Sequence, residues 1–174
     1  KRTFDQFQPK ASLTWKPSGD LSLFANYGRG FKSGGFNNQG SRATINLNFN
    51  SAPISAGLDI RDTFESETSD AFEAGFKAQA LDGALNVEGA GYVTRVKNMQ
   101  FFEFFVGTFG LLRVVSNIDK VDIKGAELAA SVRPVKGWTL FASGNVTDSE
   151  IKRNRARPDS VGNESPYTSD YTLN

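Results

Sequence analysis

The sequence predicts an all-β protein: an antiparallel segment of a transmembrane β-barrel wall, with about six strands, that does not close on its own. Two observations predict this fold. Six short windows alternate apolar and polar residues, as strands do, and all of their charged residues fall on one face. The windows are joined alternately by tight turns and long polar stretches, which is typical of the short periplasmic turns and longer extracellular loops of outer-membrane barrels.

The first two windows, residues 11–15 and 21–27, predict a hairpin. Residues 17–20, Pro-Ser-Gly-Asp, have strong turn chemistry. The apolar face of the two windows carries Ala11, Leu13, Trp15, Leu21, Leu23, Ala25 and Tyr27. Residues 30–69 follow, and because connections beyond about 12–15 residues are uncommon in soluble domains, they predict a long loop of the barrel type.

The next two windows, residues 72–80 and 85–94, are joined by Leu-Asp-Gly-Ala. In the first, Phe72, Ala74, Phe76, Ala78 and Ala80 oppose Glu73, Gly75, Lys77 and Gln79. In the second, Leu85, Val87, Gly89, Gly91 and Val93 oppose Asn86, Glu88 and Thr94. Residues 98–117 are then expected to form a second long loop.

The last two windows, residues 125–133 and 138–147, are joined by Pro-Val-Lys-Gly. Their apolar faces carry Ala126, Leu128, Ala130, Val132, Trp138, Leu140, Ala142, Gly144 and Val146. A third long loop is expected from about Ser149, and a further strand begins near Tyr171. The aromatic residues Phe24, Tyr92 and Phe141 lie on polar faces and are exceptions to the alternation.

The one-sided charges favour lipid on one side of the wall and water on the other. An Arg or Lys that faces lipid costs about 2–4 kcal/mol at mid-membrane, whereas a charge in the lumen is solvated. The residues expected to face the lumen are Glu73, Lys77, Glu88, Glu127 and Arg133.

The two tryptophans support the same facing. Trp15 precedes one tight turn and Trp138 follows another, and both fall on the apolar face. In a barrel wall both would lie in an aromatic girdle near the same membrane boundary. The alternative is that both are core residues of a soluble sandwich.

The composition excludes several kinds of site. The 174 residues include no Cys and no His, which excludes the usual zinc and haem sites and Ser-His-Asp or Cys-His catalysis. We expect no metal and no cofactor. The net charge of +1 gives no electrostatic footprint for nucleic acid. The glutamates of the polar face share it with Lys77 and Arg133, a mixed lining that is typical of a wet wall, so we expect no enzyme.

Four segments resemble one family in matched order and spacing. Residues 28–37 read GRGFKSGGFN, and residues 72–100 read FEAGFKAQALDGALNVEGAGYVTRVKNMQ. Residues 121–151 read VDIKGAELAASVRPVKGWTLFASGNVTDSEI, and residues 161–174 read VGNESPYTSDYTLN. Together they are similar to the strands and loop entries of TonB-dependent outer-membrane receptors.

The resemblance implies a fold and a function. Residues 1–174 would be part of a 22-stranded barrel with a plugged lumen, whose plug domain and remaining strands lie outside this chain. The whole receptor would bind a scarce nutrient, commonly a ferric siderophore, and import it with energy from the TonB complex. Its partners would be outer-membrane lipid, its own plug, the TonB complex and the iron chelate, in the outer membrane of a Gram-negative bacterium.

Residues of the long loops are the candidates for contact with an anionic iron chelate. They are Arg29, Lys32, Arg42, Phe102, Phe104 and Arg113. The cations could equally be solvated loop charges. The aromatic cluster at residues 101–105 could line a binding vestibule, anchor an outer girdle or pack the loop onto its neighbours.

Two other classes remain open at this stage. One is a different outer-membrane barrel, such as a diffusion porin or an outer-membrane enzyme, which would share the wall pattern without a plug. The other is a soluble all-β binding module whose apolar faces pack together in a sandwich.

Overall fold

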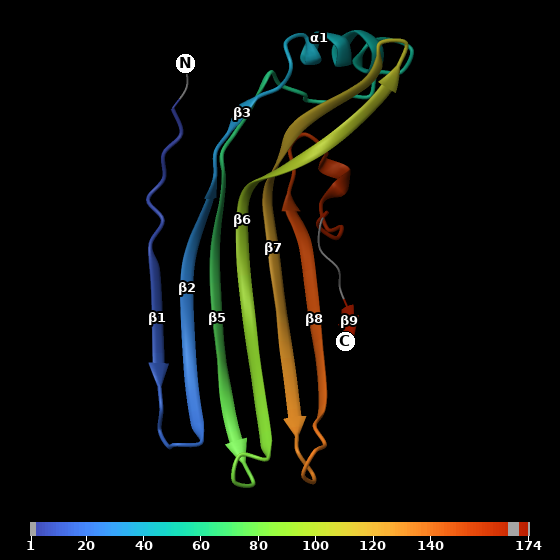
Figure 1. Cartoon of the computed structure of the whole chain (residues 1–174). Helices are drawn as coiled ribbons and strands as arrows, with labels where there is room; N and C mark the ends of the chain where they lie inside the picture. The colour runs from blue at the N-terminus through green and yellow to red at the C-terminus, as the bar shows by residue number, and fades with distance from the viewer. Residues whose placement is uncertain (1–2, 167–170, 174) are drawn as a thin grey trace.

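The computed structural model describes residues 3–166 and 171–173, and its main feature is one antiparallel sheet in a single layer (Figure 1). Its seven strands follow one another in the order β1-β2-β5-β6-β7-β8-β9. They are β1 (Lys10–Trp15), β2 (Leu21–Lys32), β5 (Glu67–Ala80), β6 (Leu85–Gly107), β7 (Gly110–Val132), β8 (Leu140–Arg153) and β9 (Tyr171–Leu173). Within the described residues β1 and β9 are open edges, so the expected all-β sheet that does not close on its own is confirmed.

The smaller elements all lie in the long connections. Strands β3 (Gly35–Phe36) and β4 (Thr63–Phe64) pair with each other in the first connection. Between them lie α1 (Ser41–Ile45) and the π-helical turn η1 (Asn46–Asn50). The 3₁₀ turn η2 (Pro158–Ser160) lies in the connection after β8. None of the helices in the described part of the chain is long and apolar enough to cross a membrane.

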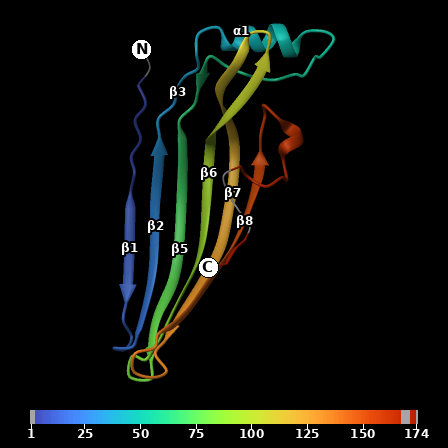
Figure 2. The same ribbon diagram turned by 45° about the vertical axis from the view of Figure 1, so that its right-hand side comes forward.

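The predicted turns and long connections lie at opposite ends of the sheet. Figures 1 and 2 show the three tight turns at the lower end, whereas α1, the β6–β7 hairpin tip and η2 lie toward the upper end. All six predicted windows form strands of the sheet. Arg133, Trp138 and Thr139 are exceptions, since β7 ends at Val132 and β8 begins only at Leu140.

The expectation of a loop at residues 98–117 is wrong. β6 and β7 continue through this stretch and pair up to Gly107 and Gly110, leaving residues 108 and 109 as the turn. The reason is that residues 101–106 are Phe, Phe, Glu, Phe, Phe and Val, most of which favour strands. Gly110 has a φ of 87°, which a residue without a side chain adopts at no steric cost.

Two small clusters hold all of the buried apolar side chains in the described residues. One joins Ile45 and Ile60 of the first connection to Phe105 and Val114 of the hairpin. The other consists of Val96, Ile118, Val121 and Ile151. Both clusters belong to the upper half of the sheet, so the wall itself has no core of its own.

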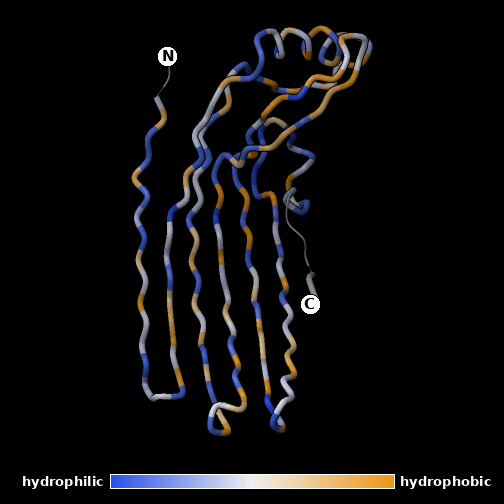
Figure 3. Tube along the Cα trace, viewed as in Figure 1, coloured by the Kyte–Doolittle hydropathy of each residue, from blue (hydrophilic) through white to orange (hydrophobic). Residues whose placement is uncertain are grey.

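The apolar face of the wall is uncovered. Leu23 and Phe76 are only half-buried, and Leu140 is 53% exposed. Figure 3 shows the alternation of hydropathy along the strands, and no second layer faces the sheet within the described residues. A soluble sandwich would bury these side chains against a second sheet.

Candidate functional site

The polar face of the wall is hollowed between β2 and β8. A hollow of about 350 Å³ is lined by Glu73, Lys77, Glu88 and Glu127, four of the five residues expected to face the lumen. A second hollow of about 510 Å³ continues toward the tight turns and shares Lys77 and Glu88 with the first. The register therefore brings charges from three strands to one surface.

The four charged side chains are spread over the polar face of the wall. Lys77 pairs with Glu88 across the strands at 3.1 Å, and both side chains are well exposed. Glu73 lies opposite Tyr92 and Glu127 opposite Ala90, so the three carboxylates occupy three different cross-strand rows. Exposed pairs of this kind contribute roughly 0–1 kcal/mol. The charged side chains therefore form a solvated lining, and no two of these three carboxylates are placed together for acid–base chemistry.

Arg133, the fifth expected lumenal residue, lies in the turn after β7. Its guanidinium donates a hydrogen bond of 2.7 Å to the carbonyl oxygen of Gly83 in the neighbouring turn. Its backbone N–H donates to the Ala84 carbonyl at 2.8 Å. Arg133 thus ties two adjacent tight turns together at the lower end of the wall.

Two of the three aromatic exceptions on the polar face have a structural explanation, whereas Phe141 is exposed. Phe24 lies opposite Gly75, and its ring would come within 2.6 Å of a Cβ placed there. Tyr92 lies opposite Gly125, over which its ring packs, and its hydroxyl is 2.6 Å from the Thr147 hydroxyl. Each ring covers a strand position that has no side chain, a known means of stabilising strand glycines.

Arg29 lies in a strand and not in the first loop. It is a residue of β2 on the same face as Tyr27, and its guanidinium donates to both carboxylate oxygens of Asp70 at 2.7 and 2.9 Å. The Tyr27 hydroxyl donates to the same carboxylate at 2.8 Å. Arg29 is therefore engaged on the outer side of the wall, away from the hollowed face.

The other loop cations are dispersed. Lys32 is the last residue of β2 and is exposed, whereas Arg42 is an exposed residue of α1. Among the contacts described, neither is paired with an aromatic candidate, whereas Arg113 is. The spacing of these residues along the chain does not indicate which cations lie beside the aromatic residues.

Phe102, Phe104 and Arg113 do come together, on one face of the β6–β7 hairpin. The Arg113 guanidinium carbon lies 4.8 Å from the centre of the Phe102 ring, and Arg113 is the cross-strand partner of Phe104. Both rings are accessible, with 39% and 61% of their surface exposed. We call these three residues the hairpin patch. The opposite face of the hairpin carries Phe105 and Val114, which pack on Ile45 and Ile60.

Polar residues that the sequence analysis did not single out hold the first connection to the hairpin. Asn37 donates to the Val115 carbonyl at 2.9 Å and accepts from the Val115 N–H at 2.7 Å. Gln100, which is buried, donates to the carbonyl oxygens of Ser33 and Glu65 at 2.8 and 3.2 Å. The partners are up to 78 residues apart in sequence, so no local motif indicates them.

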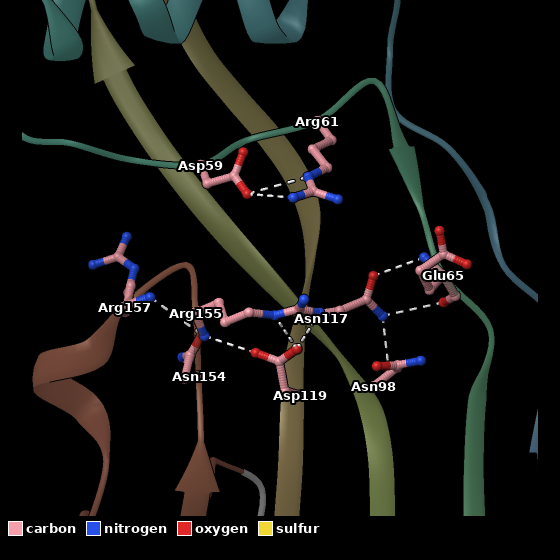
Figure 4. Close-up of polar contacts among 9 residues, drawn as sticks. All are labelled: Asp59, Arg61, Glu65, Asn98, Asn117, Asp119, Asn154, Arg155 and Arg157. Carbon is pink, nitrogen blue, oxygen red and sulfur yellow. Dashed lines mark hydrogen bonds and ion pairs between the residues drawn. The ribbon is translucent and has the colours of Figure 1, made fainter.

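A further polar network lies where three segments meet (Figure 4). Asn117 donates to the carbonyl oxygens of Glu65 and Asn98 at 3.1 and 2.8 Å. Asp119 accepts hydrogen bonds of 2.7 Å from both the backbone N–H and the side chain of Arg155. Burial would raise the pKa of Asp119, but the two bonds from Arg155 outweigh it and keep this pKa below its usual value. The network encloses a hollow of only about 70 Å³.

The connection after β8 is tied to the wall at a second point. Arg157 pairs with Glu103, a residue that is only 7% exposed. Glu103 also accepts a hydrogen bond of 2.5 Å from the Ser116 hydroxyl. We call residues 154–166 the strap. Within the described residues no group of three or more acidic side chains is placed to hold a metal ion.

Comparison with known proteins agrees with this architecture. Residues 1–174 match the family described as TonB dependent receptor-like, beta-barrel. The pesticin receptor of Yersinia enterocolitica is 28% identical over 151 residues, which are 87% of this chain and 19% of that receptor. The chain thus spans about a fifth of the length of the curated relatives that it matches.

Solved structures show the same fold. The ferric yersiniabactin uptake receptor FyuA from Yersinia pestis gives a TM-score of 0.61 at 23% identity, covering 93% of this chain and 21% of FyuA. The siderophore receptor PiuA from Acinetobacter baumannii gives a TM-score of 0.62 at 19% identity, covering 94% of this chain and 22% of PiuA. The chain therefore belongs to the TonB-dependent receptor β-barrel family, whose members are transport receptors of the Gram-negative outer membrane.

Proposed function

We propose that this chain is part of the barrel domain of an outer-membrane receptor that imports a ferric siderophore with energy from the TonB complex. The observation that carries the proposal is the two-sided wall: an exposed apolar face, a hollowed charged face and long connections gathered at one end. The apolar face would contact lipid, and the charged face would contact a plug domain. Trp15 and Trp138, both largely exposed, would lie in the periplasmic girdle.

Family relatives support an iron chelate as the substrate. FyuA is a ferric yersiniabactin uptake receptor and PiuA is a siderophore receptor. In this chain the hairpin patch offers two accessible rings and a cation on one face of the β6–β7 hairpin, which suits an anionic chelate with flat, apolar parts. Lys32 and Arg42 would add to the positive potential of the rim. Arg29 is left out because Asp70 neutralises it on the outer side.

Uptake of radiolabelled iron by cells with and without the full-length receptor tests the proposal. The probe is ferric yersiniabactin, with a catecholate and a hydroxamate chelate assayed beside it. We expect uptake of one chelate to require both the receptor and a functional TonB complex. Uptake that persists without TonB would contradict active transport and favour a diffusion porin.

The hairpin patch has its own test in the same cells. Replacing Arg113 with Gln should weaken binding of the transported chelate about five- to tenfold, because a direct contact of this kind is worth roughly 1 kcal/mol or more. Arg42→Gln is the matched comparison: Arg42 is an exposed cation of α1 that would contribute only to the long-range potential of the rim, so its loss should weaken binding less than about twofold. Equal affinity of the two variants would rule out the patch as a contact.

A further inference from the structure

The lowest row of the polar face carries no charge on β5 to β8. The strand register brings four side chains together next to the tight turns: Gln79, Asn86, Ser131 and Phe141. We call these residues the lower row. The row above it contains the Lys77–Glu88 ion pair, and the two rows beyond contain Glu127 and Glu73. Of these four rows in the described part of the wall, only the lowest lacks a charge.

Phe141 differs from the other two aromatic residues of the polar face. The rings of Phe24 and Tyr92 lie over strand glycines, whereas the residue opposite Phe141 is Ser131. The Phe141 side chain is 78% exposed, although it points to the same side of the wall as the charged residues. Because an exposed ring forgoes the free energy of burial, this position favours an apolar partner.

The wall is hollowed beside Phe141. The ring borders the hollow of about 510 Å³, which we call the lower hollow. The side chains around the ring on β7 and β8 are small: Ala129, Ser131 and Ser143. Clefts of roughly 300–1,000 Å³ accept groups of the size of a drug molecule. Because aromatic residues are enriched in the cores of protein interfaces, a projecting ring beside such a depression is suited to a folded partner.

A partner that reaches this surface has to lie inside the barrel. The chain spans about a fifth of the length of its curated relatives, and the proposed function places a plug domain from the rest of the receptor against the polar face. The transported chelate also enters the barrel, but it only passes through. The plug is therefore the occupant that can cover the Phe141 ring for most of the time.

We propose that Phe141 and the lower hollow form an apolar seat that retains the plug domain at the periplasmic end of the lumen. An apolar side chain of the plug packs against the ring, over the small side chains of β7 and β8. A charged group at this point would lose water without an ion pair from the lower row. Lys16, Asp20 and Lys77 line the hollow on the side away from Phe141, where the plug surface is polar.

The seat differs in kind from the contacts higher on the wall. Exposed ion pairs such as Lys77 with Glu88 contribute little, because water replaces each partner readily. Burial of the Phe141 ring has no such substitute in water, so its loss weakens the retention of the plug. The inference rests on the plug contact in the proposed function, but not on the identity of the transported chelate.

The test compares three variants of the full-length receptor: Phe141→Ser, Phe141→Leu and Phe24→Ser. Serine at position 141 removes the apolar contact, whereas leucine keeps it. Phe24→Ser is the matched control, because Phe24 is the same residue on the same face but covers Gly75 of the wall itself. Heat-modifiable migration on gels reports the folded barrel. Conductance of the purified receptor in planar lipid bilayers, titrated with urea, reports displacement of the plug.

We expect the wild type to be closed without urea and to open at a urea concentration that leaves the barrel folded. Phe141→Ser should lower the midpoint of opening by about 1 M, because the burial of one ring against the plug is lost. Phe141→Leu should shift the midpoint by less than about half as much. Phe24→Ser should lower the temperature at which the heat-modifiable form is lost, with the midpoint of opening close to that of the wild type.

An unchanged midpoint of opening in Phe141→Ser would overturn the proposal, and the other readouts would show what the ring contacts instead. A lower barrel-melting temperature, as in Phe24→Ser, would mean that the Phe141 ring packs on a neighbouring strand of the wall. Slower chelate uptake with full chelate binding would assign the ring to the transport path.

Two results for the wild type separate this inference from the proposed function. A receptor that conducts without urea would contradict the plug itself, and with it both proposals. A closed receptor that takes up no iron chelate, together with early opening of Phe141→Ser, would overturn only the proposed substrate.

Discussion

Glycines at single strand positions decide where aromatic side chains can pack. Gly125 on the polar face carries the Tyr92 ring directly over it, and Tyr92 in turn meets Thr147. At Gly91 on the apolar face, a Cβ would have only a backbone oxygen within 4 Å, at 3.8 Å. The two positions therefore differ in the space available to a methyl group, although both are strand glycines.

Gly125→Ala should destabilise the barrel by about 1–3 kcal/mol, because the added methyl group displaces the Tyr92 ring. Gly91→Ala is the control and should be neutral or slightly stabilising, since it adds no clash and restricts the unfolded chain. Urea unfolding of the full-length receptor in lipid vesicles measures both. Similar losses in the two variants would mean that Tyr92 does not depend on the space over Gly125.

At the scale of elements, an ion pair with a buried carboxylate links the strap to the β6–β7 hairpin. Glu103 is nearly inaccessible, and Arg157 is its cationic partner. Removing one partner of a buried pair leaves an uncompensated charge, which is far more costly than losing an exposed pair. Lys152 and Glu150 form such an exposed pair a few residues away.

Arg157→Ala should release the strap from the β6–β7 hairpin. We expect amide hydrogen exchange in residues 155–165 to accelerate about tenfold or more, which corresponds to a loss of roughly 1.4 kcal/mol in local stability. Lys152→Ala should leave exchange in this segment within about twofold of the wild type. Unchanged exchange in Arg157→Ala would show that the other contacts of the strap, with Asp119 and with Ile151 of β8, hold it without Arg157.

The elements also show what local pattern can and cannot predict. The six windows were predictable because a period of two is visible within each strand. The β6–β7 extension was not predictable in this way, since residues 98–117 are mostly apolar on both faces and show no alternation. Contacts such as Asn37 with Val115 and Asp119 with Arg155 join distant segments, so only the folded chain brings them together.

The same limit applies to the candidate ligand contacts. Phe102, Phe104 and Arg113 form one surface because the hairpin register pairs them, whereas their sequence separation does not indicate it. Arg29 was expected near the first loop, but β2 extends to Lys32 and Asp70 lies directly opposite Arg29. Strand length thus decides which cations remain available at the rim.

At the scale of the whole molecule, the two ends of the wall should differ in access from outside the cell. The exposed segment at residues 51–59 belongs to the end with the long connections, and residues 17–20 to the opposite end. Protease added to intact cells that express the receptor should cut within residues 45–63 and spare residues 17–20. Cutting at residues 17–20 alone would mean that the wall is inserted with the opposite orientation.

The central claim is that hydrocarbon covers the apolar face, and a pair of variants on one strand tests it most directly. Phe76 faces outward and Gln79 faces the hollowed side, three residues apart on β5. Barrel assembly of the full-length receptor in cells, scored by heat-modifiable migration, should fall sharply for Phe76→Arg, because an outward Arg at mid-membrane costs about 2–4 kcal/mol. Gln79→Arg should assemble as the wild type does. Equal assembly of the two variants would contradict the account.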